Sequence, residues 1–283
     1  MTKDLILSEN RDEGILRLTL NSPETQNTLS REMIQILIEE FTEAKHNKSI
    51  RVIVLEASGP VFCAGHNLKE MKEAQINPKE GKLFLKALFD SCSSLMQLIV
   101  NHPKPIIAKV DGVATAAGCQ LVASCDLAYA SETSRFATPG VNIGLFCSTP
   151  MVALSRNIKN KHAMEMLLTG DMIDASKARE IGLINDYFQA EILDAETIKI
   201  ASKIAGKSGM VLKTGKQAFY NQNTMNLSEA SLNCSSRELR SIVLLSTRAG
   251  VPVFKRSVVK PNFFNSSVNP SEACSPARPA LID

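Results

Sequence analysis

Residues 105–126 read PIIAKVDGVATAAGCQLVASCD, and this stretch decides the fold. Residues 106–110 form a short apolar run typical of a buried strand, and Asp111 with Gly112 ends it as a turn. Residues 114–118 carry almost no side-chain bulk, so an anionic ligand can lie against their backbone N–H groups where the following helix begins. The alternative is tight packing of that helix on the strand, because small residues serve it equally well.

A second turn of small residues lies within residues 60–71, PVFCAGHNLKEM. It follows an apolar strand at residues 51–57 and precedes a helix, as the first turn does. Two separate N–H groups that point at one carbonyl oxygen stabilise the negative charge that develops there in an enolate or a tetrahedral intermediate. The pair of turns therefore favours a site for such an oxygen over simple packing.

In five short segments, which include parts of both turns, the chain resembles the enoyl-CoA hydratase/isomerase (crotonase) superfamily. The segments agree with the family in order, spacing and residue type: VFCAGHNL at 61–68, DG at 111–112, GCQL at 118–121, CD at 125–126 and RFATP at 135–139. The resemblance runs from about residue 5 to about residue 263. Because it rests on several separated motifs, it is specific.

Strand, turn and helix signals alternate through most of the chain, which favours an α/β architecture. The resemblance sharpens this to a crotonase-like spiral of ββα units over residues 1–195, followed by a C-terminal helical region over residues 196–263. Residues 264–283 are rich in Ser, Pro and Ala, so we expect a disordered tail. Pro252 falls where the family's last helix runs, and a proline inside a helix costs about 3 kcal/mol, so we expect poor packing after Gly250.

The composition is that of an ordinary globular chain: of 283 residues, 44% are apolar and 22% are charged, and the formal net charge is +3. No run of Lys and Arg alternates with aromatic residues, so we expect no nucleic-acid partner. No uninterrupted apolar run approaches the roughly 18 residues of a membrane span. The seven cysteines are scattered, without a CxxC pair or a zinc-like spacing to histidine, which predicts free thiols in a reducing compartment and no metal site.

The resemblance assigns the oxyanion hole to the backbone N–H groups of His66 and Ala117. It places the substrate-binding surface on the two turns, at Ala64, Gly65, His66, Asn67, Leu68, Lys69, Ala117 and Gly118. An ordinary imidazole titrates near neutral pH, so His66 either acts on the substrate or merely flanks the pocket. Lys69 either holds the pantetheine or the phosphates of coenzyme A or is simply solvated.

Hydratases of this family use two glutamates to handle the water molecule and its proton, and here those positions are Gln120 and Gly140. An amide can orient a water molecule but cannot take its proton, and a glycine can do neither, so hydration by two carboxylates is not expected. A substitute base would be His66, or Cys147 if the site lowers the pKa of its thiol.

Two further patterns have both a functional and a structural explanation. Asn21, Pro23 and Asn27 match a family pattern near the adenosine end of coenzyme A, or they form a plain turn. Apolar residues recur at helical spacing within residues 72–101, where the family lines its acyl pocket, but such a stripe is more often core.

Two functions stay open. The first is an enzyme that binds acyl-CoA thioesters and relies on oxyanion stabilisation, for decarboxylation, isomerisation or slow hydration. The second is a non-catalytic or regulatory acyl-CoA-binding protein of fatty-acid metabolism. Neither needs a cofactor beyond the coenzyme A of the substrate.

The resemblance also implies a homotrimer or homohexamer, which we expect to form through the spiral and residues 227–250. It implies a mitochondrial location as well. The first residues, MTKDLILSENRDEG, are too acidic for a mitochondrial presequence, which leaves the cytoplasm as the alternative.

Overall fold

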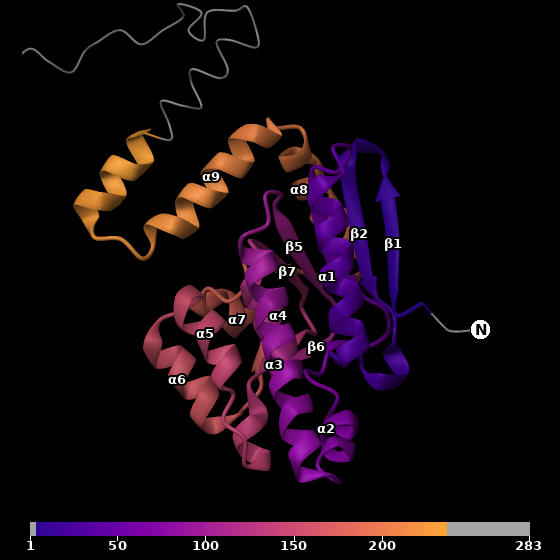
Figure 1. Ribbon diagram of the computed structural model, residues 1–283. Helices are drawn as coiled ribbons and strands as arrows, with labels where there is room; N and C mark the ends of the chain where they lie inside the picture. The colour runs from indigo at the N-terminus through magenta and orange to yellow at the C-terminus, as the bar shows by residue number, and fades with distance from the viewer. Residues whose placement is uncertain (1–3, 237–283) are drawn as a thin grey trace, which may run out of the picture. The chain divides into compact units, whose positions relative to one another are not determined.

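The computed structural model describes residues 4–236, which belong to one compact unit, Met1–Ser241 (Figure 1). The expected disruption at Pro252 and the expected tail over residues 264–283 lie outside the described residues, as does part of the 227–250 segment. The expected boundary after residue 195 falls inside a helix, α8 (Ala190–Ala205).

Two sheets form the centre of the fold. The larger one has the order β1-β2-β3-β5-β7-β10, and all its neighbours are parallel except β1 and β2. Its strands are β1 (Ile6–Arg11), β2 (Ile15–Leu20), β3 (Val52–Ala57), β5 (Ile106–Val110), β7 (Leu127–Ser131) and β10 (Asp186–Phe188). In the smaller sheet, β4, β6 and β8 are parallel and β9 is antiparallel to β8. These strands are β4 (Val61–Cys63), β6 (Val113–Thr115), β8 (Arg135–Ala137) and β9 (Ile173–Asp174).

From β3 to β8, successive strands alternate between the two sheets. In each of the pairs β3–β4, β5–β6 and β7–β8, the first strand joins the larger sheet and the second joins the smaller one. A helical segment follows each pair: α2 (Leu68–Ala74) with α3 (Pro78–Val100), then α4 (Ala117–Ser124), then η3 (Pro139–Ile143) with α5 (Ser148–Asn157). This is a spiral of ββα units, so the predicted fold class is confirmed.

Helices cover both faces of the larger sheet because its strands are apolar on both sides. On one face, Leu18 and Leu55 pack in a core with Phe41 of α1 (Arg31–His46) and Leu95 of α3. On the other face, Val54 packs with Ala201 and other apolar residues of α8. Figure 1 shows α1, α3 and α4 running alongside one another. The remaining elements are η1 (Asp12–Gly14), η2 (Pro23–Thr25), α6 (Asn160–Thr169), α7 (Ala175–Ile181) and α9 (Gly209–Gln222).

Several helix ends are where capping chemistry predicts them. Ser30 accepts a hydrogen bond from the Met33 N–H at 3.0 Å at the start of α1. Asp174 accepts one from the Lys177 N–H at 2.8 Å at the start of α7, which ends at Gly182 in the left-handed conformation.

A buried ion-pair network fixes α8 to the sheet. Arg17 on β2 donates from Nε and Nη2 to the two carboxylate oxygens of Glu56 on β3, at 2.8 and 2.6 Å. It also donates to Asp194 on α8 at 2.6 Å. Lys109 on β5 lies 2.5 Å from Glu56 and pairs with Asp194 as well. Burial raises the pKa of Glu56, but hydrogen bonds from Arg17 and Lys109 outweigh it and hold the pKa below its ordinary value.

Among residues 4–236, one helix, α3, is long and apolar enough to cross a membrane by length and composition. Lys86 and Asp90 interrupt its apolar stretch, so the sequence shows no uninterrupted apolar run there. Its most apolar window is 28% buried, and Leu88, Leu95 and Ile99 belong to the core. Core helices pass the same test, so length and composition are weak evidence for a span.

Candidate active site

Three turns meet at one edge of the smaller sheet. The parallel strands β4, β6 and β8 are neighbours, so the residues that follow their carboxyl ends lie side by side. We call them the first turn (residues 64–67), the second turn (residues 115–117) and the third turn (residues 138–140).

Hydrogen bonds join these turns. The Thr115 hydroxyl donates to the Ala64 carbonyl oxygen at 3.1 Å, which links the second turn to the first. The Ala116 N–H donates to the carbonyl oxygen of Ala137, just before the third turn, at 2.9 Å. The Ala64 N–H donates to the Gln26 carbonyl oxygen at 3.1 Å. The main chain of Ala64 is therefore engaged in holding the turns rather than open to a ligand.

The residue before each expected N–H donor has an unusual backbone. Gly65, before His66, has φ 94°, and a Cβ atom there would lie 2.9 Å from the Ala116 Cβ and 3.3 Å from the Ala117 nitrogen. Ala116, before Ala117, has φ 50° and ψ −118°, a conformation that L-residues rarely adopt. Such strain costs about 1–3 kcal/mol and clusters at functional sites. The structure thus brings the first and second turns into contact at the two expected donors.

Ala117 is the first residue of α4, so its N–H has no acceptor in a preceding helical turn. The positive end of the helix dipole adds to the attraction for negative charge at this point. Gly118, by contrast, packs on β4: a Cβ atom there would lie 2.1 Å from the Cys63 carbonyl oxygen. The expectation of tight helix–strand packing therefore holds for Gly118, while the Ala117 N–H stands at the helix end.

The His66 ring is held in one tautomer. Its Nδ1 lies 3.3 Å from the Leu29 carbonyl oxygen, and a carbonyl oxygen only accepts, so Nδ1 carries the proton. The ring packs edge to face against Phe89 of α3, with 5.2 Å between centroids. Burial lowers the pKa of His66 below its ordinary value, so the imidazole is neutral at pH 7 and Nε2 is an acceptor.

Four buried side-chain nitrogen or oxygen atoms within residues 4–236 have no hydrogen-bond partner: Thr28 Oγ1, His66 Nε2, Gln120 Oε1 and Thr197 Oγ1. Gln120 is 5% exposed and lies in α4, one helical turn after Ala117. Thr28 precedes Leu29, whose N–H donates to the Gly65 carbonyl oxygen at 2.7 Å. One of the four atoms therefore lies in the first turn, one in the segment paired with that turn and one in the helix that begins at the second turn, while Thr197 lies on α8.

The third turn leaves no room for a side chain at Gly140. A Cβ atom there would lie 2.2 Å from the Leu145 carbonyl oxygen and 2.8 Å from the Cys147 sulfur. Cys147 was a candidate base only if the site lowered the pKa of its thiol. Burial instead raises that pKa, so Cys147 does not meet the condition. Of the two substitute bases considered from the sequence, His66 is the one that keeps a free acceptor.

Other expected site residues have structural roles. Asn67 caps α2, accepting hydrogen bonds from the N–H groups of Lys69 at 3.0 Å and Glu70 at 3.3 Å. Leu68 and Lys69 are exposed. Asn27 is fully buried and donates to the carbonyl oxygens of Ser58 and Val61, which supports the plain-turn explanation for its side chain.

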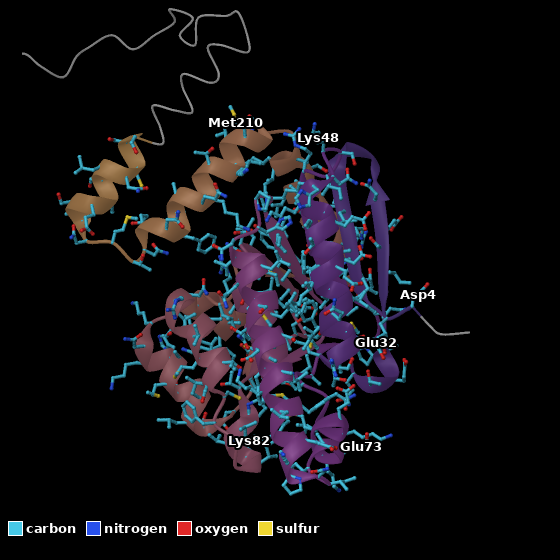
Figure 2. All side chains as sticks on the ribbon, in the orientation of Figure 1. Asp4, Glu32, Lys48, Glu73, Lys82 and Met210 are labelled. Atoms are coloured by element: carbon cyan, nitrogen blue, oxygen red, sulfur yellow. The ribbon has the colours of Figure 1, made fainter. Side chains whose placement is uncertain are left out.

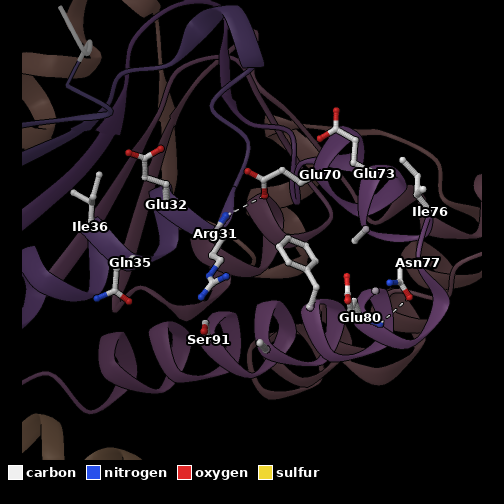
Figure 3. A pocket seen from close by; sticks show the side chains of 14 residues that line it. Arg31, Glu32, Gln35, Ile36, Glu70, Glu73, Ile76, Asn77, Glu80 and Ser91 are labelled. Atoms are coloured by element: carbon white, nitrogen blue, oxygen red, sulfur yellow. Dashed lines mark hydrogen bonds between the residues drawn. The ribbon is translucent and has the colours of Figure 1, made fainter.

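Sequence reasoning missed an open groove of about 1040 Å³ between α1 and the α2–α3 segment. Its lining is mainly acidic, with carboxylates from α1, α2 and α3 and one cation, Arg31 (Figure 3). The acidic residues are Glu32, Glu70, Glu73 and Glu80. Glu32 and Glu73 lie at the surface (Figure 2). This charge disfavours the phosphates of coenzyme A, so the groove is distinct in character from the three turns. No group of three or more metal-binding side chains is found in the part of the chain that the structure describes.

Comparison with known proteins agrees with the fold. The enoyl-CoA hydratase/isomerase family model matches residues 10–254. Enoyl-CoA hydratase domain-containing protein 3, mitochondrial, of Mus musculus is 44% identical over 249 residues, which cover 88% of this chain and 81% of the mouse protein. The 2,3-dehydroadipyl-CoA hydratase of Escherichia coli is 32% identical over 216 residues, which cover 76% of this chain and 81% of that protein.

Solved structures give the same result. The crystal structure of human enoyl coenzyme A hydratase domain-containing protein 3 matches with a TM-score of 0.81 and 42% identity, covering 87% of this chain and 95% of that chain. The spiral, the match over residues 10–254 and these relatives together show that the chain belongs to the enoyl-CoA hydratase/isomerase family.

Proposed function

We propose that this protein binds acyl-CoA thioesters, with the thioester oxygen accepting hydrogen bonds from the N–H groups of His66 and Ala117. The observation that carries the proposal is the contact of the two turns, where Gly65 meets Ala116 and Ala117. The family supports an acyl-CoA thioester as the substrate class. Coenzyme A enters as part of the substrate, and the proposal requires no separate cofactor.

The chemistry proposed for this site is stabilisation of an enolate or a related oxyanion. Fixed N–H donors in a dry site stabilise charge as it develops, without reorganisation at the moment of reaction. Gln120 cannot take a proton, and Gly140 has no space for a carboxylate side chain. We therefore propose a reaction that needs no pair of carboxylates, such as decarboxylation or isomerisation, with the neutral His66 imidazole as the available base.

A second candidate is a non-catalytic or regulatory acyl-CoA-binding protein of fatty-acid metabolism. It is favoured by the closed third turn, where the Leu145 carbonyl oxygen fills the space that a side chain at Gly140 would need. Such a protein would keep the oxyanion-hole turns for binding and have no need of an acid–base pair. Turnover of a panel of acyl-CoA thioesters by the purified protein separates the two candidates.

We also propose that the protein works as a homotrimer or homohexamer in mitochondria. Apolar side chains are exposed on η3, the segment after it, α5 and α6, at Ile143, Leu145, Val152, Met164 and Leu168. An apolar surface of this kind is typical of an interface between subunits. The location is supported by relatives that are named mitochondrial. Light scattering that gives a monomer at micromolar concentration would contradict the assembly.

The test of binding makes one substitution at the first residue of two helices, the buried Ala117 and the exposed Ala190. Ala117→Asp places a carboxylate beside the proposed thioester oxygen, and we expect it to abolish the binding of butanoyl-CoA in calorimetry. Ala190→Asp is the control, because Ala190 is exposed and is likewise the first residue of a helix, α8. Equal affinity of a folded Ala117→Asp protein and the control would refute the site.

A further inference from the structure

The open groove between α1 and the α2–α3 segment has no part in the proposed acyl-CoA site. Besides its acidic residues it has an apolar lining, to which α1, α2 and α3 all contribute: Ile36, Ala74, Gly81, Phe84 and Ala87. Ile76, in the link between α2 and α3, also lines the groove and is 84% exposed. Apolar side chains that gather in an open groove beside polar ones mark a surface for a partner.

The carboxylates of the groove lack counter-ions. Within residues 4–236, no ion pair joins Glu32, Glu73 or Glu80 to another side chain. In Figure 3, Glu32 lies toward one end of the groove, and Glu73 and Glu80 lie toward the other. The whole chain has a formal net charge of +3, so this acidic groove reverses the overall sign locally. Charge complementarity therefore points to a cationic partner.

The shape of the groove favours a helical partner. None of the residues that line it belongs to a strand, so an extended peptide would find no sheet edge for its backbone N–H and C=O groups. A helix satisfies these groups internally. The lining residues of α3 extend from Glu80 to Ser91, which is about 16 Å at 1.5 Å per residue. A partner helix of about three turns spans that length.

We propose that this groove binds a basic amphipathic helix of a partner protein. The apolar face of that helix packs against Ile36 and Phe84, and its Lys or Arg side chains pair with Glu73 and Glu80. Carboxylates repel the negative charge of an anionic membrane surface, so charge excludes that occupant. The inference goes beyond acyl-CoA binding and does not depend on it.

The test measures the binding of two fluorescently labelled peptides to the full chain by fluorescence anisotropy. Both peptides have about 14 residues, with leucine at helical positions i, i+3, i+4 and i+7. The remaining positions are lysine in one peptide and glutamate in the other. We expect the lysine peptide to bind at least about tenfold more tightly than the glutamate peptide, and high salt to reduce that preference.

Variants assign the binding to the groove. Glu73→Gln combined with Glu80→Gln should weaken the lysine peptide about tenfold, because two carboxylates of the groove become neutral. Glu132→Gln combined with Glu191→Gln is the matched control: it changes the net charge equally, at two exposed residues that do not line the groove. Ile76→Ser should also weaken binding, by about threefold or more, through the lost apolar contact.

Thermal unfolding of each variant checks that it is folded. Equal affinities for the two peptides, or no binding of either, would refute the proposal. So would a lysine peptide that binds the groove variant as tightly as the control variant, because it would then bind elsewhere. Light scattering of the chain without peptide tests another occupant. If the groove variant alone changes the molar mass, the groove binds a second copy of this chain, and the partner-helix proposal is overturned.

Discussion

Replacing Glu56 by glutamine should destabilise the protein through the network that holds α8 on the sheet. The carboxylate of Glu56 accepts from Arg17 at 2.8 and 2.6 Å and from the Thr19 hydroxyl at 3.0 Å, and it pairs with Lys109 at 2.5 Å. In Glu56→Gln the side chain keeps its shape, but one carboxylate oxygen becomes an NH2 group, which cannot accept from Arg17, Thr19 or Lys109. Two cations in the interior also lose their buried counter-ion.

Removing one partner of a buried ion pair costs about 3–5 kcal/mol. Asp194 remains beside Arg17 and Lys109, and its side chain is 51% exposed, so part of the charge stays compensated. We therefore expect a loss near the lower limit, about 3 kcal/mol, which is a large share of the 5–15 kcal/mol that stabilises an ordinary domain.

Urea denaturation followed by circular dichroism measures this loss. The control is Glu196→Gln on α8, the helix that the network anchors. Glu196 pairs with Lys199 at the surface, so the change should cost no more than about 1 kcal/mol. Because the folded-state pKa of Glu56 lies below its ordinary value of 4.5, its contribution is present above pH 4.5 and is lost as the pH falls toward the folded-state pKa. A Glu56→Gln protein as stable as the control at pH 7 would refute the reasoning.

Three further outcomes are expected. Gly140→Ala should destabilise the fold by about 1–3 kcal/mol, because the added Cβ would meet the Leu145 carbonyl oxygen. Gly215→Ala is the control, because Gly215 has open space around it. Equal midpoints of urea unfolding for the two variants would contradict this prediction. Hydration of crotonyl-CoA, followed by the loss of enoyl absorbance, should be at least about 10²-fold slower than in a two-carboxylate hydratase, and rapid turnover would overturn the reading of Gln120 and Gly140. The His66 ring should titrate in nitrogen NMR with a midpoint below its ordinary pKa of 6.5, because burial disfavours the charged imidazole. The unfolded chain then binds the proton more readily, so the stability of the fold should decrease as the pH falls below 6.5. A midpoint at or above 6.5 would be inconsistent with the burial of the ring.

Local chemistry made much of the fold predictable. The strand at residues 106–110 and the caps at Ser30 and Asp174 follow from residue type and spacing over a few positions, and the structure has them there. The break between α2 and α3 also carries a local signal: Asn77 accepts from the Glu80 N–H at 3.5 Å, and Pro78 is the first residue of α3.

Other elements depend on partners far away in the chain. The strand β1, with the sequence ILSENR, is polar at its centre and end, and it is a strand because it pairs with β2. The strand β10 has three residues and pairs with β7, more than fifty positions earlier in the sequence. The sequence pattern within such segments is too weak to identify them, since the hydrogen bonds that stabilise them are not local.

The candidate site shows the same division. The motifs locate both turns, and small residues explain why the turns can approach each other. The crowding at Gly140 depends on the path of residues 141–147, and the free acceptor of His66 depends on which ring nitrogen faces Leu29. Neither is encoded in residue spacing, so both needed the three-dimensional structure.

The central claim is that two backbone N–H groups hold the thioester oxygen, and infrared spectroscopy tests it most directly. Butanoyl-CoA labelled with carbon-13 at the thioester carbonyl would be bound to the protein, and the stretching frequency of that carbonyl compared with the free thioester in water. Two fixed donors in a dry site polarise the carbonyl more than water does, so the account predicts a shift to lower frequency. Mixing the thioester with folded Ala117→Asp protein, which should not bind it, should leave the carbonyl at its frequency in water. A carbonyl frequency in the complex equal to or higher than that in water would contradict the account.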